Sequence, residues 1–217
     1  MIPLAPPAVP PYPKRAIYIV DKPGAPQTSL AVATIGAPRS TPDYVPLEVM
    51  NMVFGGQFSS RINMNLREEH GYTYGAHSSF AFRRGAGPFS ASAGIRTDAT
   101  APAVQELFRE VERIRNTELS AEELKVAKDA WALSLAGDFE TTADIAETEG
   151  GLFVYGLPSD YYGGLSKLIN AVTATDVQRV AKEALHPESM VVIAVGDRAR
   201  IAPELEKLNL GPVQLVP

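Results

Sequence analysis

The 217-residue sequence contains no cysteine. It therefore cannot form a disulfide, use a thiol nucleophile or bind zinc through thiolates, and it suits a reducing or an oxidising compartment equally. Long apolar runs are also missing, since none approaches the roughly 20 residues that span a bilayer. The N-terminus also lacks the charged segment followed by an apolar segment that is typical of a signal peptide. We expect a soluble chain without a membrane span, periplasmic if it was cut from an exported bacterial protein and otherwise cytoplasmic.

Positive charge is not in excess, since the chain has 20 basic and 25 acidic residues and a net charge of −5. The two signs are interspersed, which argues against nucleic acid as a partner. Histidine is scarce, and His70, His77 and His186 lack the spacing of His-x-x-Glu-His or His-Glu-x-x-His. We therefore expect no cofactor or metal site within this chain. There is also no Gly-x-Ser-x-Gly elbow, which argues against a serine nucleophile.

Proline is concentrated at the start of the chain, with six prolines in residues 1–13. Such a segment disfavours helix and sheet and favours an extended, semi-rigid form. We predict a proline-rich linker at 1–13 and a single domain at 14–217. A hydrophobic content of 45% is enough for that domain to build a core.

The periodicity of apolar residues predicts the secondary structure. In chain order we expect strands at 16–21 and 28–35, helices at 42–54 and 59–71, strands at 73–82 and 87–96, four or five helices over most of the eighty residues that follow, a strand at 189–196 and a helix at 199–208. This order predicts an α+β fold with a mixed, mainly antiparallel sheet and helices packed on one face. The first two strands are expected to form a hairpin or to lie near one another, and the last strand inserts beside earlier ones.

Arg67 and Tyr74 stand seven residues apart across a helix-to-strand corner. Gly71 between them can adopt the positive φ that ends a helix, so both side chains can converge on one end of the sheet. His77, at odd parity to Tyr74, is expected on the opposite sheet face. Taken singly, Arg67 also fits a surface ion pair and Tyr74 a half-buried strand aromatic, so the spacing leaves both interpretations open.

The segment 54–61 (FGGQFSSR) followed by 66–75 (LREEHGYTYG) resembles the insulinase, pitrilysin and mitochondrial-processing-peptidase family of zinc peptidases. More narrowly, it is similar to their second homologous domain, which lacks the metal. The flanks at 21–28 and 150–153 agree, so the resemblance covers nearly the whole chain after the prolines. It implies the same α+β fold that the order of elements predicts.

The resemblance implies half of an enzyme. In such peptidases a zinc-bearing homologous domain or subunit with His-x-x-Glu-His closes a chamber around a peptide substrate, and the metal-free half contributes an arginine and a tyrosine. Arg67 and Tyr74 match that pair, which implies roles in substrate orientation and oxyanion stabilisation. Zinc is then expected on the partner half, and the isolated chain should be inactive. The glycine-rich substrate loop of the processing peptidases is short here, at Gly55 and Gly56.

Other functions remain open at this point. The chain could be a non-catalytic scaffold or assembly subunit of the same fold, as in some respiratory-complex relatives, although the retention of both Arg67 and Tyr74 argues against it. A free-standing hydrolase would need a nucleophile or a metal that the sequence does not offer. Homo-association of the isolated domain is a further option for partners.

Overall fold

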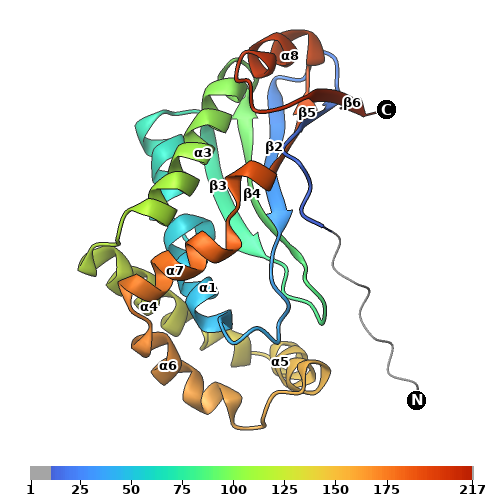
Figure 1. Ribbon diagram of the computed structural model, residues 1–217. Coiled ribbons are helices and arrows are strands. Elements are labelled where there is room, and N and C mark those ends of the chain that lie inside the picture. Colours follow the sequence, from blue (N-terminus) through green and yellow to red (C-terminus); the bar gives the residue numbers. More distant parts are fainter. Residues whose placement is uncertain (1–10, 217) are drawn as a thin grey trace.

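A computed structural model describes residues 11–216 of the chain (Figure 1). Its centre is a six-stranded sheet in the order β3-β4-β2-β5-β1-β6. The strands are β1 (Ile17–Asp21), β2 (Gln27–Ile35), β3 (Thr73–Phe80), β4 (Pro88–Arg96), β5 (Val191–Gly196) and β6 (Val213–Val216). The linker predicted at 1–13 lies outside the described residues except for 11–13, which form neither helix nor strand.

The sheet is mixed, as the sequence predicts. β3, β4, β2 and β5 pair antiparallel in succession, whereas β1 runs parallel to both β5 and β6. The late strand β5 lies between β1 and β2, so those two are near neighbours and not a hairpin. The sequence analysis misses β6, a four-residue edge strand with mostly exposed side chains, because it has no buried face to produce an alternating pattern.

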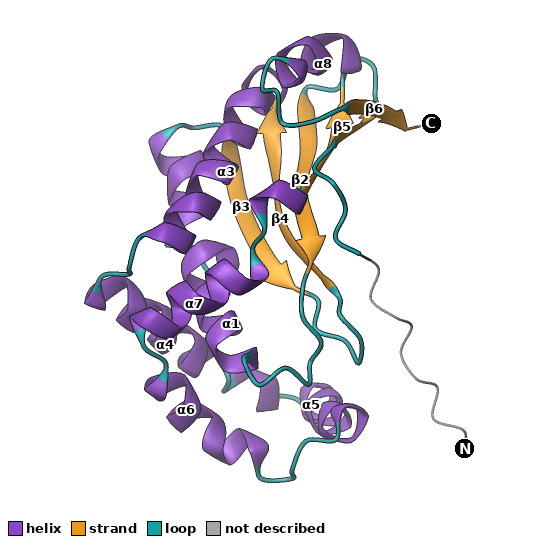
Figure 2. Ribbon diagram, viewed as in Figure 1, coloured by secondary structure: helices purple, strands orange, loops and turns teal. Residues whose placement is uncertain are grey.

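The helices pack on one face of the sheet, with α3, α7 and α1 lying along the same side (Figure 2). Their bounds are α1 (Tyr44–Asn51), α2 (Arg61–Asn63), α3 (Thr100–Asn116), α4 (Ala121–Ser134), α5 (Thr142–Tyr155), α6 (Tyr161–Ala171), α7 (Ala174–Ala184) and α8 (Arg198–Glu206). Five of them fall in the predicted helical block. Ser120 and Glu123, three positions apart in the sequence, predict a capping box. It forms at the start of α4, where the side chain of each residue bonds the other's backbone N–H.

The core lies between this helical layer and the sheet. Inward-facing strand residues such as Leu30 and Val32 meet the apolar stripe of α3, which includes Val104, Leu107 and Val111, and all of them are buried. Side chains at alternate positions of β2 and β4 are buried or exposed in turn. The fold class that the sequence predicts is therefore confirmed, with one face of the sheet left open.

Two predicted helices contain a wider turn. α1 continues into a π-helix at Met52–Gly56, and the short α2 continues into a second π-helix at Met64–Glu69. The first π-helix packs closely on β3, since a Cβ added to Gly55 would lie 2.6 Å from the backbone nitrogen of Ser78. Glycine at position 55 thus permits the approach. π-Helical turns occur often at functional sites, and the second one carries Arg67.

Helix α5 is packed more sparsely than α3 or α7. Leu152 is its one buried residue among the described ones, and Gly150 and Gly151 lie in its interior. Phe153 is 91% exposed. The helix is therefore held by few apolar contacts. None of the described helices is long and apolar enough to cross a membrane.

Candidate functional site

Gly71 makes the corner between the second π-helix and β3. Its φ is +60°, its N–H donates to the carbonyl of Arg67 at 3.1 Å, and the N–H of Tyr72 donates to the carbonyl of Leu66 at 2.8 Å. These bonds use carbonyls that a helix end otherwise leaves free. The helix therefore ends where the sequence predicts it, and Arg67 occupies its last turn.

Replacing Gly71 by alanine should destabilise the fold by about 1 kcal/mol, because an L-residue at this positive φ is strained even though a Cβ would meet no atom within 4 Å. Gly150→Ala is the matched control with the opposite sign. Gly150 is exposed inside α5, where alanine should stabilise by about 0.5–1 kcal/mol. Urea unfolding of both variants measures the difference, and equal changes would contradict the cap assignment.

A β-bulge places Tyr74 at the start of β3. Tyr74 and Gly75 together oppose Gly94 alone, while Thr73 and Ala76 on either side both face the core. The hydroxyl of Thr73 stabilises the bulge. Its oxygen lies 2.9 Å from the carbonyl oxygens of both Gly75 and Gly94, which share its single O–H, and it accepts from the N–H of Gly75 at 3.1 Å. Tyr74 is consequently turned outward and is 89% exposed.

The bulge also corrects the expectation for His77. The extra residue shifts the alternation by one, so His77 is exposed like Tyr74 and does not lie on the opposite face. Its Nε2 lies 3.0 Å from the Oγ of Ser92 on β4. Simple parity counting fails here because it assumes an unbroken strand.

Arg67 approaches the same region from the helix side. Its guanidinium carbon lies 4.7 Å from the centroid of the Phe58 ring, and its Nε is 3.3 Å from a carboxylate oxygen of Glu68. Asn63 connects the Phe58 loop to β3: its amide donates to the Phe58 carbonyl at 2.6 Å, and its oxygen accepts from the N–H of Ala76 at 3.0 Å. The arginine and the tyrosine thus stand on elements that are bonded to each other.

Both side chains line one open cavity of about 620 Å³ at this end of the sheet. Gln27 and Arg96 line it as well, and they are directly paired across β2 and β4. The sequence analysis does not place Gln27 or Arg96 in the site, because only the register of the sheet brings them together. Arg96 is held by Asp98 through two hydrogen bonds at 3.2 and 3.3 Å.

A buried acidic cluster supports the π-helix from behind. The amide nitrogen of Asn65 donates to Glu106 at 3.1 Å and to Glu110 at 3.2 Å, and these two residues of α3 are only 7% and 4% exposed. Arg109 and Arg113 pair with the two carboxylates from the solvent side at 2.7 and 3.4 Å. Asn65 therefore connects the backbone segment of Arg67 to the core of the domain.

The histidines serve local contacts. His70 stacks on Tyr72 with ring centroids 4.9 Å apart, and the Nε2 of His186 lies 2.9 Å from the carbonyl of Glu183 at the end of α7. Within residues 11–216, no group of three or more histidine, aspartate or glutamate side chains is arranged to hold a metal ion.

Comparison with known proteins gives one family match. Residues 2–130 match a family model described as the peptidase M16 inactive domain. A search of curated proteins finds no significant match.

Solved structures share the fold. A peptidase M16 inactive domain from Pseudomonas fluorescens superposes with a TM-score of 0.81 at 28% identity, covering 89% of this chain and 46% of that one. A protease from Helicobacter pylori gives 0.76 at 19% identity over 89% of this chain and 48% of that one. A chain of complex III2 from Candida albicans gives 0.70 at 15% identity, covering 93% and 50%. The present chain thus spans about half the length of each.

Proposed function

Because the chain belongs to the family of peptidase M16 inactive domains, we propose that it is the metal-free half of a zinc peptidase. In this proposal a homologous domain or subunit with His-x-x-Glu-His supplies the zinc, and the two halves enclose a peptide. Arg67 and Tyr74 face that peptide from this half. The observation that carries the proposal is the exposure of Tyr74, 89%, on the wall of the cavity that Arg67 also lines.

Tyr74 suits the task of an oxyanion donor. Its hydroxyl forms no hydrogen bond with the residues that the structure describes. The hydroxyl group therefore has no structural role among those residues and is free to bind a ligand. A neutral phenol O–H can donate to the carbonyl oxygen of a substrate as negative charge develops there. The bulge at Thr73 orients the Tyr74 side chain away from the sheet, so the donor is preorganised for substrate binding.

Arg67 suits the task of substrate orientation. The guanidinium is planar and presents several N–H donors in a fixed fork, which can hold the backbone carbonyl of an extended peptide. Its stacking on Phe58 and its pairing with Glu68 restrict the side chain while leaving its exposed edge toward the cavity. Loss of this residue should weaken substrate binding more than it changes the chemistry.

The metal belongs to the other half in this proposal. The described residues offer no set of ligands for zinc. We therefore assign to this chain only the binding and polarisation of the peptide carbonyl. A bound zinc would supply the nucleophile from the partner.

Complementation tests the function. The chain is mixed with a homologous domain that carries His-x-x-Glu-His, and cleavage of a fluorogenic peptide is followed with and without a chelator. We expect neither half to cleave alone, the mixture to cleave, and the chelator to abolish the activity. Size-exclusion chromatography of each component reports homo-association and complex formation. Cleavage by this chain alone, or a complex that forms and stays inactive, would contradict the proposal.

A second candidate is supported by the fold match to a chain of complex III2, whose printed name describes an assembly. On that alternative the chain is a scaffold subunit, and Arg67 and Tyr74 have no catalytic role. The complementation assay separates the two, because a scaffold forms a complex without giving it peptidase activity.

A further inference from the structure

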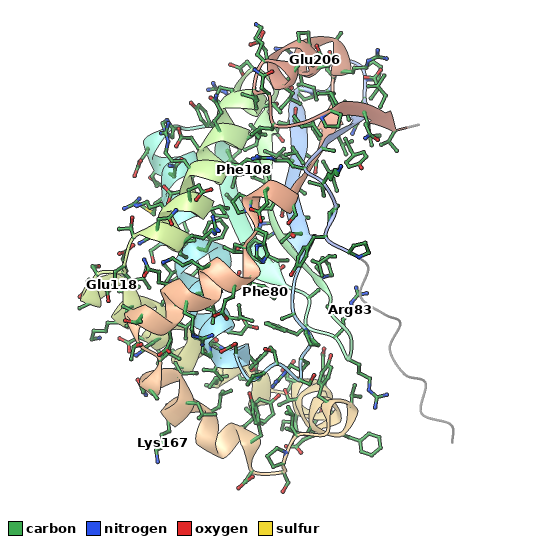
Figure 3. All side chains as sticks on the ribbon, viewed as in Figure 1. Phe80, Arg83, Phe108, Glu118, Lys167 and Glu206 are labelled. Carbon is green, nitrogen blue, oxygen red and sulfur yellow. The ribbon has the colours of Figure 1, made fainter. Side chains whose placement is uncertain are left out.

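A second cavity lies at the other end of β3. It has a volume of about 400 Å³ and shares no lining residue with the cavity of Arg67 and Tyr74. Phe80 and Arg83, labelled in Figure 3, mark this end of the β3–β4 hairpin. Since Phe80 stands six positions after Tyr74 on the strand, the two cavities lie on the order of 20 Å apart.

The walls of this cavity are strongly aromatic. Tyr44 of α1, Trp131 of α4, and Tyr161 and Tyr162 of α6 all line it. Trp131 is the only tryptophan of the chain. Burial raises the pKa of the hydroxyls of Tyr44 and Tyr162, so both remain protonated donors at neutral pH. The cavity therefore combines apolar ring faces with neutral hydroxyl groups.

Arg39 supplies a buried positive charge to this aromatic cavity. The residue is 8% exposed, and its guanidinium carbon lies 3.5 Å from the centroid of the Tyr44 ring and 5.1 Å from that of Tyr161. Its backbone N–H donates to the carbonyl of Arg83 at 2.7 Å, which fixes the segment. Among the described residues, the guanidinium itself makes no hydrogen bond and no ion pair. Its nitrogens are not fully enclosed, so they are open to the cavity, where an anion would form charge-assisted hydrogen bonds with them.

The acidic groups nearby restrict the ligand to a single charge. Glu48 of α1 lines the cavity, and burial raises its pKa to about 7 against the opposing effect of Arg39. Asp138, an exposed residue, lines the cavity as well. A dianion such as phosphate would be repelled by both carboxylates, whereas a monoanion meets a positive field when Glu48 is protonated.

We propose that this cavity is a binding site for a small monoanion, namely a carboxylate carried on an aromatic or apolar body. The carboxylate binds the guanidinium of Arg39, and the apolar body lies among the rings of Tyr44, Trp131 and Tyr161. The site is independent of the peptidase role. A failure of either proposal would therefore leave the other unaffected.

Binding is measured with phenylacetate as the probe, by isothermal titration and by the fluorescence of Trp131. Its neutral isostere phenylacetamide and the cation phenethylamine are titrated alongside on the unaltered protein. We expect phenylacetate to bind on the order of 10-fold or more tightly than phenylacetamide, since the amide lacks the charge-assisted bond to the arginine. Phenethylamine should bind still more weakly.

Variants locate the site. Arg39→Gln should remove the preference for phenylacetate, and Arg84→Gln, which neutralises an exposed arginine of the nearby hairpin, should leave it unchanged. Binding should tighten from pH 8 to pH 6 as Glu48 becomes neutral, and Glu48→Gln should abolish that dependence. Should Arg39→Gln fail to fold, the isostere comparison still decides. Equal binding of phenylacetate and phenylacetamide, or no binding of either, would overturn the proposal.

Discussion

Tyr74→Phe should lower the turnover of the complemented peptidase by roughly 10²- to 10³-fold, because it removes one donor to the developing oxyanion. The change in KM should be small, since the hydroxyl acts mainly when charge develops in the transition state. Stability should not change, because the side chain is 89% exposed and its hydroxyl has no partner among the described residues. Steady-state kinetics with saturating zinc-bearing partner provide the measurement.

Two variants sharpen this result. Tyr18→Phe deletes a hydroxyl from β1, a strand that the cavity does not include, and should leave both kinetic constants unchanged. Arg67→Gln should raise KM more than it lowers turnover, which separates orientation of the peptide from polarisation of its carbonyl. If Tyr74→Phe leaves turnover unaltered in an assembled, active enzyme, the oxyanion role is wrong.

Asn65→Leu should destabilise the protein by about 2–3 kcal/mol. The substitution keeps the size of the side chain but removes the amide that donates to Glu106 and Glu110, two carboxylates that are 7% and 4% exposed. A buried charged group that loses its donor costs more than a neutral one, although the arginines on the outer side retain part of the compensation. Urea unfolding at neutral pH should show the loss as a lower midpoint with an unchanged slope.

Asn116→Leu on α3 is the matched control. Asn116 donates to a carboxylate oxygen of Glu112 at 2.9 Å, the same type of bond in an exposed position. There water can replace the amide, so we expect a change within about 0.5 kcal/mol. Equal losses in the two variants would show that the burial of the cluster around Asn65 does not matter.

The sequence predicts the fold better than the site, for physical reasons. Alternation and helical spacing are local and strong wherever an element has one buried face. This is why the strands of the β3–β4 hairpin and the helical block that begins with α3 are predicted correctly. β6 has no buried face, so its sequence shows no alternation from which a strand could be predicted. The capping box at Ser120 is predicted because its chemistry lies within four consecutive residues.

Features that depend on contacts distant in sequence are not predicted. The corner at Gly71 is local and can be predicted from the sequence. The bulge depends instead on the hydrogen bond from Thr73 to β4, which is why the side of the sheet on which His77 lies is predicted incorrectly. Arg96 enters the first cavity only through its register opposite Gln27. The second cavity brings Arg39 together with residues more than ninety positions later, a distance over which sequence spacing carries no information.

The sparse packing of α5 has a consequence for motion. A helix held by one buried side chain, Leu152, and weakened by internal glycines can open at a much lower free energy than the sheet, so its amides should lose protection against hydrogen exchange first. Tyr155 of this helix lines the aromatic cavity. We therefore expect local opening of α5 to remove Tyr155 from the wall of that cavity while the sheet stays folded.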